Sequence, residues 1–158
     1  MSTQMTESPD AIAPPRLGKR IWAVVAGFIA VVVLSIGTDA VLHSMHVFPP
    51  LGQRMSDKLF LIATIYRTVY AILGSYITAR LAPDRPMAHA LAGGIIGLIL
   101  GSVGAAVTWS RAQLGPHWYP LALVVTALPC AWIGGKIREL EIKKYYPVEP
   151  APPRSTSI

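Results

Sequence analysis

The residues of this chain best suited to chemistry are one acid and one base inside apolar stretches. Arg67 lies in the middle of LFLIATIYRTVYAILGSYITA, and Asp39 lies near the end of IWAVVAGFIAVVVLSIGTDAVLH. A guanidinium in hydrocarbon costs about 2.5–3.5 kcal/mol on insertion scales, so it needs a partner. We expect Asp39 and Arg67 to form a salt bridge. The pair would either only hold two helices together or line a path for an ion or substrate.

Three histidines form a second group. His43 follows Asp39 by four residues on the same helix face, His46 comes next, and His117 lies in a later connection. Such residues can bind zinc or copper, but histidines at a membrane interface are commonly plain polar residues, so the metal site stays open. The chain lacks a P-loop, a G-x-S-x-G, H-E-x-x-H or C-x-x-C motif and a glycine-rich dinucleotide signature. We therefore expect a non-enzymatic protein with no cofactor.

Composition indicates helices that cross a membrane. Hydrophobic residues make up 53% of the chain and charged residues only 14%, against about 25% charged in soluble domains. The apolar runs are continuous, which excludes alternating barrel strands, and each approaches the roughly 20 residues that a bilayer core needs. We predict an all-α fold, a four-helix antiparallel membrane bundle at residues 18–144. The expected spans are residues 21–43, 59–80, 87–109 and 118–137.

The two ends of the chain and its basic residues predict topology. Residues 1–17 and 145–158 are polar or proline-rich, and we expect disordered cytoplasmic tails. Nine lysines and arginines near the span ends would lie on the side of the termini, against three (Arg54, Lys58 and Arg111) on the other side. The positive-inside rule therefore places both termini in the cytoplasm. Because the charges flank apolar spans, the basic pI of about 9.8 does not indicate nucleic-acid binding.

The second span has two different faces. Small and polar residues share one stripe, and large apolar residues share the other. In lipid the small and polar face packs inward, so Arg67 should point into the bundle and Tyr76 should face lipid. The inward stripe comprises Thr64, Arg67, Ala71, Gly74, Ser75 and Thr78.

The third span carries Gly93, Gly97 and Gly101 at four-residue spacing. This small-xxx-small pattern lets helix backbones approach closely. It predicts helix packing, either within one bundle or between two copies.

Three stretches resemble small four-span inner-membrane proteins of Gram-negative bacteria. They are GTDAVLH, VFPPLGQ and YRTVYAILGSYITARLAPDRPMAHAL, and the resemblance covers about residues 20–140. It implies location in the inner membrane and a four-helix architecture, and it carries no catalytic residue across.

These observations favour a small multi-pass membrane protein with a structural or partner-binding role. Its partners would be the lipid bilayer and either itself or another membrane protein, with no nucleic acid. The alternative is a small transporter or channel subunit with Arg67 and Asp39 in its polar path.

Overall fold

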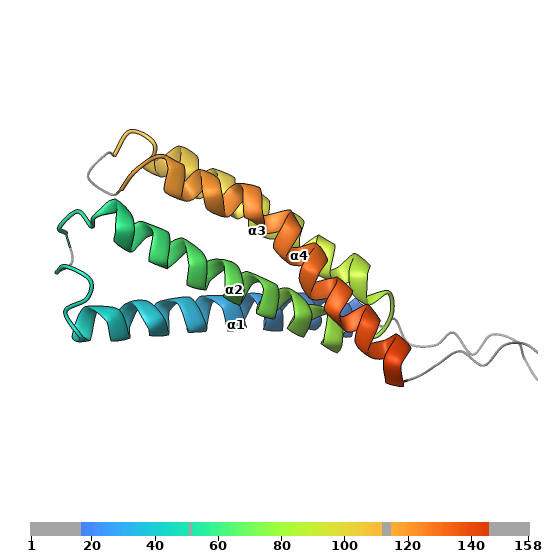
Figure 1. Ribbon diagram of the computed structural model, residues 1–158. Coiled ribbons are helices and arrows are strands. Elements are labelled where there is room, and N and C mark those ends of the chain that lie inside the picture. Colours follow the sequence, from blue (N-terminus) through green and yellow to red (C-terminus); the bar gives the residue numbers. More distant parts are fainter. Residues whose placement is uncertain (1–16, 51, 112–114, 146–158) are drawn as a thin grey trace, which may run out of the picture.

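The computed structural model describes residues 17–50, 52–111 and 115–145, which form four helices and no strand (Figure 1). For this part of the chain the all-α prediction is confirmed. Each helix is long and apolar enough to cross a membrane. The predicted tails lie outside the described residues, except that Leu17 and Tyr145 belong to helices. The helices are α1 (Leu17–Ser44), α2 (Asp57–Leu81), α3 (Pro86–Thr108) and α4 (Trp118–Tyr145).

Local sequence signals define where the helices begin and end. Asp57 in the first turn of α2 complements the positive end of the helix dipole, and Pro86 suits the first position of α3. After α1, His46 adopts a left-handed backbone with φ 57°. This lets the N–H groups of Val47 and Phe48 both donate to the carbonyl of Leu42, at 3.0 and 3.1 Å. The chain therefore turns sharply after α1, and α2 runs in the opposite direction.

The four antiparallel helices form two hairpins, α1–α2 and α3–α4 (Figure 1). α2 packs against each of the other three helices, most extensively against α1 and α4. The end that holds Leu17, Tyr145 and the α2–α3 turn is called the terminal end, and the opposite end the loop end. In Figure 1 the hairpins meet near the terminal end and separate toward the loop end.

Glycines allow the close helix contacts, and these contacts lie in the terminal half. A Cβ atom on Gly27 of α1 would overlap the carbonyl oxygen of Gly74 on α2. A Cβ on Gly134 of α4 would lie only 2.6 Å from the carbonyl oxygen of Ile72 on α2. Between α3 and α4, a Cβ on Gly94 would overlap the side chain of Ala131. Backbones thus touch where no side chain separates them, which is how helices pack in lipid.

The distribution of large and small residues is the reverse of that in a soluble bundle. Six of the nine buried apolar residues are alanines, whereas large side chains such as Val33, Ile36 and Val125 are 61%, 62% and 71% exposed. Soluble proteins bury most of their isoleucine and valine. This surface is suited to contact with lipid tails rather than water.

α4 is both long and bent. Its 28 residues span about 42 Å at 1.5 Å per residue, more than the roughly 30 Å hydrocarbon core of a bilayer. Pro129 lies inside the helix, and Figure 1 shows α4 changing direction along its length. A proline removes one backbone hydrogen bond and crowds the preceding turn, which accounts for such a bend.

Candidate functional site

Asp39 and Arg67 meet between α1 and α2. Nη2 of Arg67 lies 2.5 Å from Oδ2 of Asp39, and the two side chains are 31% and 28% exposed. Arg67 is ten residues into α2, or about 15 Å from the start of the helix at 1.5 Å per residue. The antiparallel hairpin brings the end of α1 to this depth, so the two charges neutralise each other inside the first hairpin.

Tyrosine and threonine hydroxyls complete this polar cluster. Tyr66 donates to Oδ1 of Asp39, so both carboxylate oxygens have a partner. The hydroxyls of Thr38 and Tyr70 are 2.8 Å apart and form a second link between α1 and α2. The part that Thr38 plays was not predicted from the sequence, although Thr38 adjoins Asp39 as Tyr66 adjoins Arg67.

Not every hydrogen-bond donor of the Arg67 guanidinium has a partner among the described residues. Its Nε atom is buried and has no hydrogen-bond partner among the described residues. From α4, Tyr119 packs against Phe60 of α2, with ring centroids 5.0 Å apart. α4 thus contacts α2 on the loop side of the cluster.

The structure does not gather the histidines. Nδ1 of His43 lies 2.8 Å from the backbone carbonyl oxygen of Asp39, and its ring meets Phe48 edge-on. Nε2 of His117 lies 2.8 Å from the carbonyl oxygen of Trp109, and the two rings stack at 4.5 Å. His46 is exposed in the α1–α2 connection. Among the residues that the structure describes, no group of three potential ligands could hold a metal ion.

A second polar network lies at the terminal end, and it corrects the prediction for Tyr76. The hydroxyl of Tyr76 donates to Glu141 of α4 at 3.0 Å and accepts a hydrogen bond from Arg80 at 2.7 Å. Tyr76 therefore faces α4 and not lipid. Arg138 also pairs with Glu141, at 2.8 Å. The extension of α4 beyond residue 137 supplies Glu141, so the network joins the two hairpins.

The three glycines of the predicted α3 stripe do not all face a neighbouring helix. A Cβ on Gly97 would meet nothing within 4 Å, and one on Gly93 would first meet Val24 at 3.9 Å. On Gly101 it would meet Val124 at 3.3 Å, a tight contact. The close approach of α3 to α4 is instead at the buried Gly94. Successive helical residues point about 100° apart, so Gly93 and Gly94 face different sides.

Gly93 and Gly97 form one wall of an apolar groove between α1 and α3. The groove has a volume of about 300 Å³, and Gly74 and Ser75 of α2 form part of its floor. Val24 and Phe28 of α1 stand on the opposite side. α1 and α3 contact each other at few places, so the groove stays open between them.

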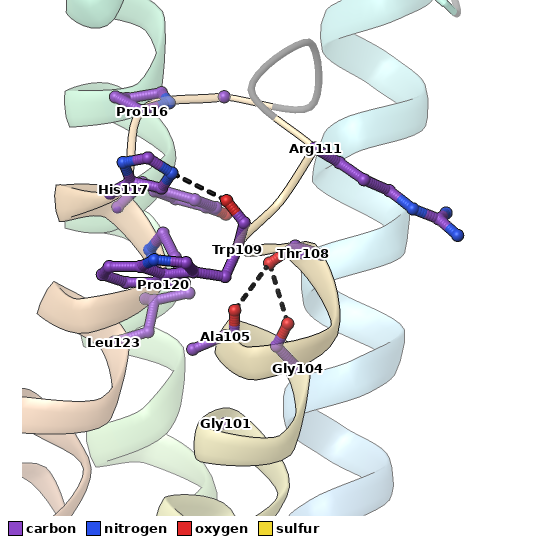
Figure 2. Close-up of a pocket in the computed structure, with 12 residues that line it drawn as sticks. Gly101, Gly104, Ala105, Thr108, Trp109, Arg111, Pro116, His117, Pro120 and Leu123 are labelled. Atoms are coloured by element: carbon purple, nitrogen blue, oxygen red, sulfur yellow. Dashed lines mark hydrogen bonds between the residues drawn. The ribbon is translucent and has the colours of Figure 1, made fainter.

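A separate pocket of about 270 Å³ opens between the loop ends of α3 and α4 (Figure 2). Figure 2 shows the ring of His117 beside Trp109, while the side chain of Arg111 points away from the pocket. The hydroxyl of Thr108 bonds back to the carbonyls of Gly104 and Ala105, at 2.8 and 3.3 Å. The pocket therefore offers apolar surface and no free polar group from Thr108.

Comparison with known proteins adds no family to these observations. The resemblance to small four-span inner-membrane proteins accordingly stays a prediction from the sequence. No protein family, curated protein or solved structure matches this chain.

Proposed function

We propose that this chain is a multi-pass protein of the bacterial inner membrane with both termini in the cytoplasm. The exposed valines and isoleucines and the four spanning-length helices support the membrane location. The excess of lysine and arginine at the terminal end supports the orientation. Reporter fusions after Arg54 and after Arg111 test it, since both should report the periplasmic side. A cytoplasmic signal at either position would refute this topology.

The proposed role is structural and partner-binding, with no enzymatic activity. The observation that carries it is the open glycine wall of the groove, where a Cβ on Gly97 would meet nothing. Glycines on a helix surface allow a second helix to approach closely. The partner we propose is a second copy of this chain, because two α3 helices related by a two-fold axis would place Gly93 and Gly97 of each against the other. The Asp39–Arg67 pair then serves to hold α1 and α2 together.

Two leucine substitutions on adjacent faces of α3 separate the dimer from the fold. Gly97→Leu enters open space in the monomer, so it should leave thermal stability unchanged and abolish the dimer. Gly94→Leu must displace Ala131 of α4, so it should destabilise the monomer itself, by about 1–3 kcal/mol. Oligomeric state is measured by cross-linking in membranes and by light scattering in detergent.

The matched control is Gly37→Leu, because Gly37 of α1 is exposed and its Cβ, like that of Gly97, would meet nothing within 4 Å. This variant should remain dimeric. If Gly97→Leu and Gly37→Leu both keep the wild-type oligomeric state, the groove is not a dimer interface and the proposal fails.

A second candidate role, a transporter or channel subunit, is favoured by Arg67, whose side chain is partly exposed and whose Nε has no hydrogen-bond partner in the part of the chain that the structure describes. The pairing of Asp39 argues against it, because each carboxylate oxygen already has a partner and Arg67 neutralises its charge. Flux measured with the purified protein in proteoliposomes decides between the roles. An ion flux that Arg67→Met removes, while the protein remains folded, would favour the transporter.

A further inference from the structure

One side of α4 near the terminal end is apolar, exposed and ends in two lysines. Ile133, Ile137 and Leu140 are 37%, 45% and 56% exposed. Successive helical residues point about 100° apart, so these three residues and Lys144 lie on one side of the helix. Lys143 adjoins this side, and both lysines are exposed. These five residues are called the α4 terminal face.

Positive charge accumulates around this face. Among the described residues, the terminal end holds eight lysines and arginines against three acids, and the loop end holds three against one. Each of the three acids at the terminal end is already paired with a lysine or arginine. Glu141 is shared by Arg80 and Arg138, at 3.2 and 2.8 Å. Lys143 and Lys144 form no ion pair in the part of the chain that the structure describes, so their charge is available to a partner.

The position of the two lysines along α4 fits the headgroup layer of a bilayer. They lie six and seven residues beyond Ile137, where the predicted span ends, or about 9–10 Å at 1.5 Å per residue. The headgroup region on each side of the hydrocarbon core is about 5–8 Å thick, and a lysine can reach along the helix with its apolar stem. A single phospholipid would therefore place its phosphate at the lysines and an acyl chain along Ile133 and Ile137.

The combination of charge and apolar surface distinguishes between partners. A soluble acidic protein would pair with the lysines but could not cover the isoleucines inside the membrane. A zwitterionic lipid brings a positive group of its own close to the lysines. An anionic lipid fits both parts of the face, because basic residues beside an apolar helix surface attract negative headgroups.

We propose that the α4 terminal face binds an anionic glycerophospholipid of the cytoplasmic leaflet, with Lys143 and Lys144 at its phosphate and the apolar residues along an acyl chain. The inference rests on the membrane location and orientation proposed above. It does not depend on the dimer, because the glycine wall of the groove belongs to α3.

Quenching of tryptophan fluorescence by brominated lipids measures which lipid lies beside α4. Trp132 adjoins Ile133 and is exposed, and Trp118 at the opposite end of the same helix is the internal control. Trp22→Phe, Trp109→Phe and Trp118→Phe together leave Trp132 as the only tryptophan, and a second triple variant leaves Trp118. Each full-length chain is placed in phosphatidylcholine vesicles with brominated phosphatidylglycerol, or with the same fraction of brominated phosphatidylcholine. The ratio of the two quenching strengths gives the preference for the anionic lipid.

The preference should differ between the two ends of α4. At Trp132 we expect a ratio of about 3 or more, because each exposed ion pair is worth a factor of about 1.4–5 and two lysines are available. At Trp118 the ratio should be close to one, since the first turn of α4 carries no charge. Raising the salt concentration from about 0.1 to about 1 M shortens the Debye length from about 10 to about 3 Å, so the preference at Trp132 should fall.

Three double variants make the test specific. Lys143→Gln with Lys144→Gln should bring the ratio at Trp132 close to one, whereas Lys143→Arg with Lys144→Arg keeps the charge and should keep the preference. The matched control, Lys58→Gln with Arg111→Gln, removes the same charge at the loop end and should leave the ratio unchanged. All four positions are exposed, so these variants should fold. If a single-tryptophan chain fails to fold, the difference in quenching between wild type and Trp132→Phe gives the same ratio.

Four results would overturn the inference: no preference at Trp132, an equal preference at Trp118, a preference that survives both lysine-to-glutamine changes, or an equal loss in the loop-end control. With the first result, the surplus charge would serve a soluble acidic partner or the orientation of the chain alone. Flotation of the vesicles separates this failure from failure of the proposed function. A chain that does not float with the vesicles is not in the membrane, whereas one that floats without a lipid preference leaves the membrane location intact.

Discussion

Removing the partners of the Asp39–Arg67 pair singly and together should give strongly non-additive losses of stability. The variants are Asp39→Ala, Arg67→Met and the double. Each single change leaves a charge without its partner inside the bundle, whereas the double change leaves none. Contact between two residues appears as a coupling energy in such a cycle.

The partial exposure of Asp39 and Arg67 determines how much stability each single substitution should cost. Breaking a fully buried ion pair costs about 3–5 kcal/mol, and an exposed pair is worth about 0.2–1 kcal/mol. With side chains 31% and 28% exposed, we expect about 3 kcal/mol for Asp39→Ala and about 2 kcal/mol for Arg67→Met. The order follows from chemistry: a carboxylate left alone keeps Tyr66 and can be neutralised by a proton, whereas a guanidinium cannot lose its charge.

The double variant should then lose about 2–3 kcal/mol instead of the 5 kcal/mol expected for independent sites, a coupling of about 2 kcal/mol. Unfolding is followed by circular dichroism during titration of mixed micelles with dodecyl sulfate. If the two single losses add within about 0.5 kcal/mol, the ion pair contributes nothing to stability and the reasoning is refuted. A folded double variant that still supports cell growth favours the holding role, and a folded but inactive one favours a path.

Three further changes test the packing. Gly134→Val should cost about 3 kcal/mol or more, measured in the same titration, because its Cβ would lie 2.7 Å from the Cβ of Ser75; a wild-type midpoint would show that α4 does not touch α2 there. Glu141→Gln should lower Tm modestly and weaken its dependence on salt, since it removes the negative charge shared by Arg80 and Arg138; an unchanged salt dependence would show that these pairs do not contribute. Tyr70→Phe should cost about 1 kcal/mol, the value of its hydrogen bond to Thr38; no change would mean that the hydroxyls do not bond.

The sequence predicts the helices well because length and the absence of charge decide whether a segment can span a bilayer. It also makes the Asp39–Arg67 contact expected, since one embedded acid and one embedded base lie in consecutive antiparallel spans. The sequence does not predict how each helix is rotated about its own axis, which decides the residues that face a neighbouring helix. Gly93 and Gly94 are adjacent, and the spacing of glycines alone does not say which of them faces a neighbour.

Tyr76 shows the same limit at longer range. Its partner Glu141 is 65 residues away and lies in the extension of α4 beyond the last apolar segment. Helical periodicity within α2 assigns Tyr76 to the large apolar face. The contact depends on how far α4 continues and how it crosses α2 at Gly134, and neither is visible in a single span.

The position of the ion pair within the first hairpin has a consequence for biogenesis. The chain is made from its N-terminus, so Asp39 is already present when Arg67 leaves the ribosome, and α3 and α4 are not yet made. A lone arginine would oppose insertion by about 2.5–3.5 kcal/mol. In the proposed membrane topology, Arg67 paired with Asp39 allows α2 to enter the bilayer together with α1 before the second hairpin exists. A nascent chain truncated after Arg85 should therefore insert two helices efficiently, and Asp39→Ala should lower the inserted fraction of the second.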